Sequence, residues 1–410
     1  MNLRRLRIGP GLLVTAAFIG PGTVVTASKA GAAFGYQLVW ALAFAVAATV
    51  ILQEMSARLG VVTGHGLGEA LRDTFTRPAS RGATVALVVS AIAFGNAAYQ
   101  MGNVTGAASA LEILTGASRN AWAIVVGLAA AVVLATGWYV FIERVLIALV
   151  VVMSAVFIIT AVRGGPDLVA ILRGVRPAVP AGSGVTIIAL IGTTVVPYNL
   201  FLHASAAREK WGRASDRAAA LHQARWDSAL AVLLGGGVTL AILITAAAAF
   251  PVGTAIQDVA AMATQLEPLL GRGARNFFAV GFGAAGLTSA ITAPLAAAYA
   301  TRGILGWPSD MKSARFRAVW GFVLAVGTVL ACLGWRPERA ILFAQAANGV
   351  LLPIIAAYLL VVMNRSALLA DHRNHWAANA AGFGVVLFVV FLVWQQMSML
   401  WGRIMASGGG

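Results

Sequence analysis

Long runs without charged residues dominate the chain. Eleven stretches of at least 18 residues lack Asp, Glu, Lys and Arg. They are residues 8–28, 30–53, 82–111, 120–142, 145–162, 177–207, 228–257, 276–301, 318–335, 340–364 and 376–402. A helix needs roughly 17–25 mostly apolar residues to cross a bilayer. The pattern therefore predicts an all-α integral membrane protein with eleven transmembrane helices, in a single domain over residues 1–410.

The amino-acid composition also indicates a membrane protein and excludes several classes of function. The chain is 60% hydrophobic and 10% charged, with a mean hydropathy of +0.85, whereas about a quarter of the residues of a soluble domain are charged. These values exclude a water-soluble enzyme, a disordered chain and a nucleic-acid-binding domain. No nucleophile–base pair, phosphate loop or pair of histidines at helical spacing is evident, so we expect neither enzymatic activity nor a cofactor. The partners we expect are the lipid bilayer and a small-molecule or ion substrate.

The net charge of +15 belongs to the loops of such a protein and predicts its orientation. With the N-terminus inside, the inside segments hold about twice as many Lys and Arg as the outside segments, as membrane insertion favours. We therefore expect a cytoplasmic N-terminus and an outside C-terminus. The Ala- and Arg-rich, Lys-poor composition indicates a bacterial inner membrane.

Two of the predicted spans carry a helix breaker near their middle. Span 8–28 contains Gly20-Pro21-Gly22-Thr23, and span 177–207 contains Val196-Pro197-Tyr198-Asn199. Proline removes a backbone donor and clashes with the preceding turn. In lipid the freed backbone groups need partners, so irregular backbone at this depth implies a lined cavity.

The two breakers occupy the first span of each five-span half. The halves are residues 8–162 and 177–364, and residues 376–402 form an eleventh helix. This arrangement is typical of secondary transporters with inverted repeats, which bind substrate between two discontinuous helices and work by alternating access. The alternative is a pair of ordinary proline kinks.

Several segments resemble the Nramp family of proton-coupled divalent-metal transporters. The similar segments are "GPGLLVTAAFIGPGTVVTASKAGAAFGYQLVW", "ILQEMSARLGVVTGHGLGEALRD", "AYQMGNVTGAASALEIL", "VVPYNLFLHAS" and "FAQAANGVLLP". They follow the order of the family's helices 1, 2, 3, 6 and 10. The resemblance implies a leucine-transporter-type fold, with two inverted five-helix repeats in which helices 1 and 6 are discontinuous.

The metal site of that family does not carry over to this sequence. Its first-helix motif is Asp-Pro-Gly-Asn. In this chain Gly20 replaces the aspartate and Thr23 replaces the asparagine. Its sixth-helix motif is Met-Pro-His-Asn, where this chain has Val196 in place of the soft thioether ligand. The third-helix acids attributed to proton transfer are replaced by Gln100 and Asn103. We therefore predict that the usual transition-metal site is lost and assign no metal ligand.

The distribution of acids supports this prediction, because nearly all 14 lie in loops or at span ends. A bare dication at mid-membrane would then be poorly compensated at high desolvation cost. The N-termini of half-helices instead present free N–H groups that suit a carboxylate. Thr193 is one neutral donor near the breaks. The candidate substrate-binding residues are Gly20, Gly22, Thr23, Thr26, Thr194, Val196, Tyr198, Asn199 and Gln345.

Lys29 and His203 are candidates for charge compensation or proton coupling, beside Gln100 and Asn103. A lysine within a membrane bundle is a functional hypothesis by default, and Lys29 either neutralises an anionic substrate, carries a proton or snorkels to the outer surface. His203 is a candidate proton relay, which leaves H⁺ coupling open.

Three functions remain open on this evidence. We favour a secondary transporter of a small organic solute, either a carboxylate or an amino-acid-like compound. The second is a divalent-cation transporter with altered selectivity, for hydrated Mg²⁺ or another metal ion. The third is a non-transporting sensor or degenerate paralogue.

Overall fold

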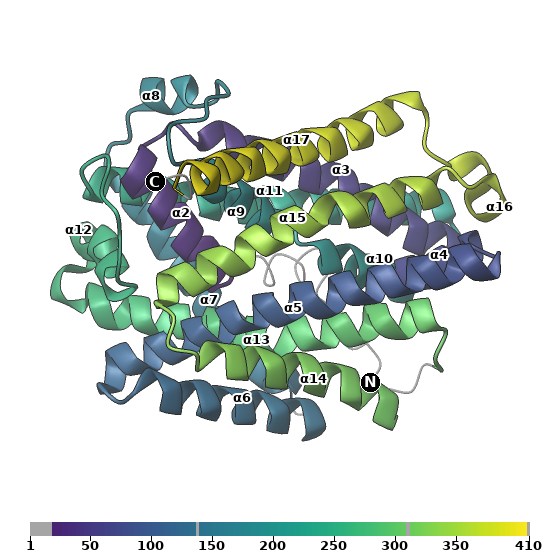
Figure 1. Cartoon of the computed structure of the whole chain (residues 1–410), viewed down its shortest axis with the longest axis horizontal. Helices are drawn as coiled ribbons and strands as arrows, with labels where there is room; N and C mark the ends of the chain where they lie inside the picture. The colour runs from purple at the N-terminus through teal and green to yellow at the C-terminus, as the bar shows by residue number, and fades with distance from the viewer. Residues whose placement is uncertain (1–18, 137–138, 309–311, 408–410) are drawn as a thin grey trace.

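The computed structural model describes residues 19–136, 139–308 and 312–407, and these residues are almost entirely helical. Most of the long helices run roughly along the long axis of the molecule (Figure 1). Within the described ranges, ten helical segments are long and apolar enough to cross a membrane. The remaining predicted span, 8–28, is described only from Ile19 onward, and its earlier residues lie outside the described ranges.

The first half of the chain comprises α2 (Pro21–Phe34), α3 (Val39–Thr63), α4 (Leu67–Thr74), α5 (Pro78–Thr115), α6 (Arg119–Thr136), α7 (Tyr139–Arg163) and α8 (Leu168–Arg173). The second half comprises α9 (Gly184–Thr194), α10 (Pro197–Trp211), α11 (Arg217–Ala249), η2 (Ala260–Leu266), α12 (Glu267–Leu270), η3 (Gly271–Gly273), α13 (Ala274–Leu305), α14 (Ala314–Ala331) and α15 (Pro337–Met363). The chain then continues through α16 (Ser366–Leu369), η4 (Ala370–His372) and α17 (Trp376–Ser407). The division into two repeats stays a prediction.

The uncharged stretch that predicted the second span is offset from the helix that the structure shows. The second span was expected at residues 30–53, but α2 continues through Lys29 to Phe34 and α3 covers Val39–Thr63. Gly35, with a φ of 56°, provides the turn between them. Lys29 therefore lies within the helix of the first span, and its ammonium donates to the carbonyl of Ile256 at 2.8 Å.

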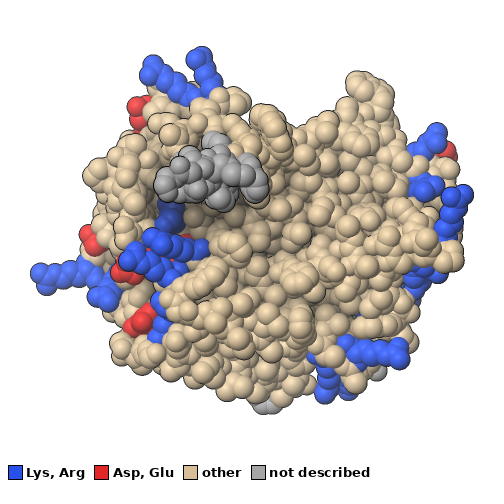
Figure 2. Space-filling view, in the orientation of Figure 1, with Lys and Arg blue, Asp and Glu red and all other residues tan. Residues whose placement is uncertain are grey.

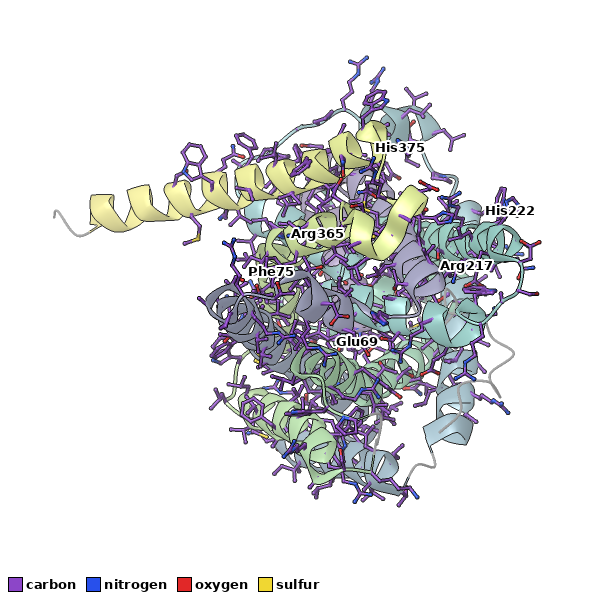
Figure 3. The ribbon with its side chains drawn as sticks, turned by 90° about the vertical axis from the view of Figure 1, so that its right-hand side faces the viewer. Glu69, Phe75, Arg217, His222, Arg365 and His375 are labelled. Atoms are coloured by element: carbon purple, nitrogen blue, oxygen red, sulfur yellow. The ribbon has the colours of Figure 1, made fainter. Side chains whose placement is uncertain are left out.

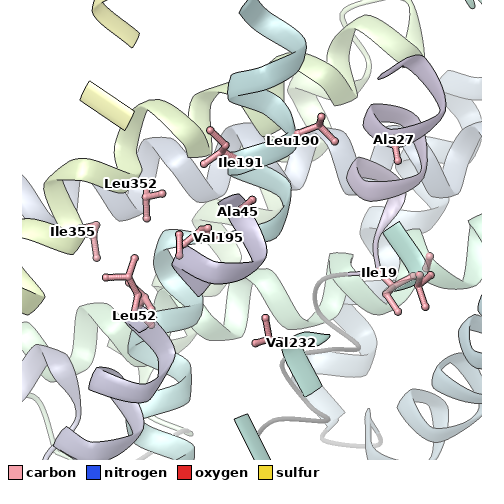
Figure 4. Packing of buried hydrophobic residues seen from close by; sticks show 14 of the residues in the cluster. Ile19, Ala27, Ala45, Leu52, Leu190, Ile191, Val195, Val232, Leu352 and Ile355 are labelled. Atoms are coloured by element: carbon pink, nitrogen blue, oxygen red, sulfur yellow. The ribbon is translucent and has the colours of Figure 1, made fainter. Parts of the chain in front are cut away.

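Small residues let neighbouring helix backbones approach closely. A Cβ added to Gly31 of α2 would lie 2.2 Å from the carbonyl oxygen of Leu243 on α11. A Cβ added to Gly60 of α3 would lie 2.2 Å from the carbonyl oxygen of Ala204 on α10. Such contacts replace the hydrophobic driving force that is missing between helices in lipid. Away from these close contacts, buried apolar side chains of α2, α3, α9 and α15 belong to one cluster (Figure 4).

Charged side chains gather toward the two ends of the long axis and leave a broad uncharged band between them (Figure 2). Large apolar side chains are exposed on the helices that face outward, among them Leu128 on α6, Val151 on α7 and Leu387 on α17. This distribution fits a protein whose middle zone contacts hydrocarbon.

Two ion-pair networks join helices at the end of the molecule that carries α4 and α16, where Figure 3 labels Glu69 of the second network. In the first, Arg58 of α3 lies 3.0 Å from Glu54 and donates to the His372 carbonyl and the Asn374 side chain, each at 2.7 Å. It thereby holds the segment between α16 and α17 against α3.

The second network ties α4 to two other helices. Glu69 of α4 lies 3.0 Å from Arg208 of α10 and 3.9 Å from Arg302 of α13. The same acid therefore restrains the far end of α10, which begins at the second helix break.

Replacing Arg58 should destabilise the protein more than replacing Arg225. The Arg58 side chain is 7% exposed and serves three acceptors, whereas Arg225, which also pairs with Glu54, is 56% exposed. We expect Arg58→Met to cost about 2 kcal/mol or more and Arg225→Met less than about 1 kcal/mol. Thermal unfolding of the detergent-solubilised variants measures the difference, and equal melting temperatures would contradict it.

Candidate functional site

The second predicted helix break is present, and the first is described only from Ile19 onward, where α2 begins. Helix α9 ends at Thr194 and α10 begins at Pro197, with Val196 extended at φ −80° and ψ 118°. Helix α2 begins at Pro21 after an extended Gly20, with φ −101° and ψ −178°. Proline suits the first position of a helix because the N–H it lacks would have no partner there.

The two breaks lie against each other through a pair of threonine hydroxyls. Thr23 Oγ1 and Thr193 Oγ1 are 3.0 Å apart and both side chains are buried. The neighbouring Thr194 instead donates to its own helix at the Leu190 carbonyl, at 2.9 Å. Thr23 and Thr193 therefore form the bridge between α2 and α9, while the Thr194 hydrogen is used within α9.

Gln345 of α15 fills the space beside this bridge. A Cβ added to Gly22 would lie 2.1 Å from Gln345 Nε2, and one added to Gly192 would lie 2.0 Å from the Gln345 carbonyl oxygen. The two glycines let α15 approach both α2 and α9. The predicted residues Gly22, Thr23 and Gln345 are thus brought together.

Several buried polar atoms near the breaks have no hydrogen-bond partner. Both side-chain polar atoms of Gln345 and of Asn199 are in this state, as is the hydroxyl of Thr26. An unsatisfied buried polar group costs about 1–3 kcal/mol. These groups therefore favour a bound ligand or water that satisfies them, which is the physical signature of a binding site.

An aromatic wall closes another side of the site. Val196, Tyr198 and Tyr99 of α5 belong to one buried cluster, and the two tyrosine rings have centroids 5.4 Å apart at 62°. A Cβ on Gly20 would lie 3.6 Å from the Tyr99 hydroxyl and 2.9 Å from Ser289 Oγ. Tyr99 and Ser289 were not among the residues expected from the sequence, although the tyrosine directly precedes Gln100, which was.

A small cavity lies behind Tyr198, between α5, α10 and α15. Asn96 and Asn348 contribute polar groups to its lining, and Ile92 and Leu351 contribute apolar ones. Its volume of about 10 Å³ available to water centres suits roughly one water molecule. Unpartnered Oδ1 of Asn96 and Nδ2 of Asn348 are available to bind that water.

The two predicted coupling positions on α5 differ in their surroundings. Gln100 donates to the Ala290 carbonyl of α13 at 3.0 Å, and its side chain packs where a Cβ on Gly327 of α14 would lie. It therefore acts as a bond between helices. Asn103 is buried with both amide atoms unpartnered.

His203 faces α11 one turn beyond Asn199. Its Nε2 lies 2.8 Å from Ser228 Oγ, and the Ser228 hydroxyl donates to the Ala224 carbonyl at 2.7 Å. Because that hydroxyl hydrogen is already used, His203 Nε2 donates the bond and Nδ1 is left without a partner. This arrangement defines the neutral tautomer that carries its hydrogen on Nε2.

The site is neutral in charge. Within the described ranges, no group of three or more His, Cys, Asp or Glu residues is placed to hold a metal ion. Lys29 lies farther along α2, where it bonds the Ile256 carbonyl.

Removing the unpaired amide of Gln345 should stabilise the ligand-free protein. Methionine matches glutamine in length and brings no polar group, so Gln345→Met should raise the free energy of unfolding by about 1 kcal/mol. Gln100→Met is the matched control and should lower it, because Gln100 donates to Ala290. Thermal unfolding without ligand measures both shifts, and a loss of stability in Gln345→Met would contradict the assignment.

Comparison with known proteins supports the same architecture. The family model described as natural resistance-associated macrophage protein-like (Nramp) matches residues 11–398. The divalent metal cation transporter MntH of Klebsiella pneumoniae (strain ATCC 700721 / MGH 78578) is 28% identical over 391 residues, which cover 94% of this chain and 92% of the relative. The MntH of Klebsiella pneumoniae (strain 342) is 29% identical over 395 residues, with the same coverage.

Solved structures agree with the predicted fold. The manganese transporter of Eremococcus coleocola, in complex with an aromatic bis-isothiourea substituted compound, superposes with a TM-score of 0.74 at 22% identity, covering 94% of this chain and 84% of that one. MhsT in complex with L-phenylalanine superposes with a TM-score of 0.58 at 14% identity, covering 93% and 98%. The leucine-transporter-type membrane fold is thereby confirmed. Because the family match spans nearly the whole chain, this protein belongs to the Nramp family of membrane transporters.

Proposed function

We propose that this protein transports a divalent cation by alternating access, and that the cation keeps part of its water shell at the site. The observation that carries the proposal is the set of unpartnered neutral groups at the helix breaks, above all the amides of Asn199 and Gln345. Relatives 28% and 29% identical are named divalent metal cation transporters. They favour this alternative over the organic solute that was preferred on sequence alone.

The polar groups around Gln345 are closely packed. The side chain of Gln345 lies so close to Gly22 that even a methyl group there would displace it. Thr23 and Thr193 close the adjacent side through their hydroxyl contact. Small polar groups converge on this point, and amide and hydroxyl oxygens are ligands that hard cations accept.

The residue types predict altered selectivity. Val196 stands where a thioether would favour transition metals. Gly20 stands where a carboxylate would compensate a bare dication. Loss of both groups should favour a hard cation that retains water, such as Mg²⁺ or Mn²⁺, over softer metals.

One observation supports the organic solute as a second candidate. Helices α2 and α10 both begin at the breaks without a side-chain cap on their first N–H groups. Such N-termini bind carboxylates. A carboxylate solute would use these backbone donors together with the amide groups of Asn199 and Gln345.

Uptake into proteoliposomes tests the two candidates together. The wild-type protein should take up Mn²⁺ or Mg²⁺ saturably, and Asn199→Leu should reduce uptake by at least about tenfold, because it removes an amide that we place at the site. Asn120→Leu, on the exposed start of α6, is the control and should transport normally. No cation uptake, combined with thermal stabilisation by one carboxylate solute, would instead support the organic carrier.

Gly20→Asp should strengthen metal binding. A Cβ at this position would lie 2.9 Å from Ser289 Oγ and 3.6 Å from the Tyr99 hydroxyl, so the carboxylate would be added beside these two hydroxyls. We expect Mn²⁺ affinity in calorimetry to rise by about tenfold or more, because an anion then compensates the dication. Gly20→Asn adds the same volume without the charge, and an equal gain in both variants would contradict the electrostatic reason.

A further inference from the structure

Two opposite charges lie at matching positions outward from the candidate site. Lys29 follows Gly22 by seven residues on α2, and Glu338 precedes Gln345 by seven residues on α15. Seven residues span about two helical turns, or roughly 10 Å, and return to the same face. Gly22 and Gln345 are in contact, so these two charges are set the same distance beyond that contact, toward the end that carries α8 and α12.

Glu338 is a buried acid with an unpaired oxygen. The residue is 1% exposed, and its Oε2 atom has no hydrogen-bond partner. The acids at the opposite end differ, since Glu54 and Glu69 are both engaged by arginines. A buried carboxylate oxygen without a partner is expensive. A cation bound to this oxygen would relieve that cost.

Lys29 partly compensates the charge of Glu338 without forming a direct ion pair with it. The Glu338 carboxylate attracts the Lys29 ammonium, and the Arg339 guanidinium repels it. The ammonium itself donates to the Ile256 carbonyl at 2.8 Å, in the segment that follows α11. No ion pair of 4.0 Å or less joins Lys29 to Glu338 in this part of the described chain. The carboxylate is thus compensated at a distance and still open to a closer cation.

We propose that Glu338 is an outer binding station for the transported divalent cation, and that Lys29 is its resident counter-charge. An entering cation binds the free Glu338 oxygen and takes over the compensation that Lys29 provides at longer range. It then has about two turns to travel to the neutral groups around Gln345. Glu338 thus places a negative charge near the site, whereas Gly20 leaves the site itself without one. This inference rests on the proposed function.

Removing Glu338 and removing Lys29 should change the apparent affinity for the transported cation in opposite directions. In proteoliposomes holding the full chain, Glu338→Gln should raise the KM for Mn²⁺ or Mg²⁺ uptake by about tenfold or more, because it removes the attracting charge. Lys29→Gln should lower that KM by about threefold or more, because it removes a competing cation. Lys29→Arg keeps the charge and should stay near the wild-type value.

A matched control separates the station from the general surface charge. Glu267→Gln removes one negative charge from exposed α12 at the same end of the molecule and should leave the KM unchanged. Calorimetric titration of Mn²⁺ into the purified variants provides a readout independent of transport. If Glu338→Gln does not fold, the Lys29→Gln arm still tests the proposal.

The possible failures are distinguishable. If the wild-type protein neither binds nor takes up divalent cations, the proposed function falls and this inference falls with it. If the wild-type protein transports cations but Glu338→Gln keeps its KM, only the station is wrong. If Glu338→Gln and Lys29→Gln raise the KM equally and lose stability together, the pair is a structural contact, and the station is again wrong.

Discussion

The arrangement of this protein depends on the fact that backbone groups freed within a membrane must find partners inside the protein. Both helix breaks satisfy this requirement by the same means. A proline begins the outgoing half-helix, so that one orphan N–H is absent. Helix α15 then packs against both breaks, and Gly22 and Gly192 give it the room to do so. Close packing of α15 compensates for the irregular backbone at Gly20 and at Val195–Val196, and the side-chain amides of Asn199 and Gln345 remain without partners.

Charge is distributed according to the same constraint. Ion pairs at the end with α4 and α16 are direct and serve to join helices, as Arg58 and Glu69 show. Toward the middle the described side chains at the breaks are neutral, and the polar groups that occur there are amides and hydroxyls. Without a bound cation, a neutral site destabilises the folded protein less than a buried, unpaired carboxylate would. Binding must then draw on weaker dipoles, which suits a substrate that keeps some of its own solvation.

The elements that the sequence predicted well are those with local signals. Hydropathy identified the spans, and the two proline motifs located the breaks, because each signal lies within one short segment. The failures concern relations between segments. The sequence placed Lys29 within the bundle, but it could not indicate that its hydrogen-bond partner is a carbonyl from the segment after α11. The rotation of α9 about its axis determines that Thr193 and not Thr194 faces Thr23. Sequence periodicity cannot predict that rotation, because the helix is interrupted next to these residues. Glu338 was counted among acids at span ends, although packing buries it.

Gly31, Gly60 and Gly20 differ in what faces them, which bears on how the chemistry of this protein can diversify. Gly31 and Gly60 face the backbone of another helix, so a larger residue there would push two helices apart. Gly20 faces the hydroxyl of a serine, and the side chain of Val196 forms part of a wall. Side-chain volume is therefore fixed at Gly31 and Gly60, while the type of ligand can change at Gly20 and Val196. A lineage can exchange one cargo for another through substitutions at the breaks and keep every helix in place, so specificity in such a scaffold is expected to drift faster than architecture.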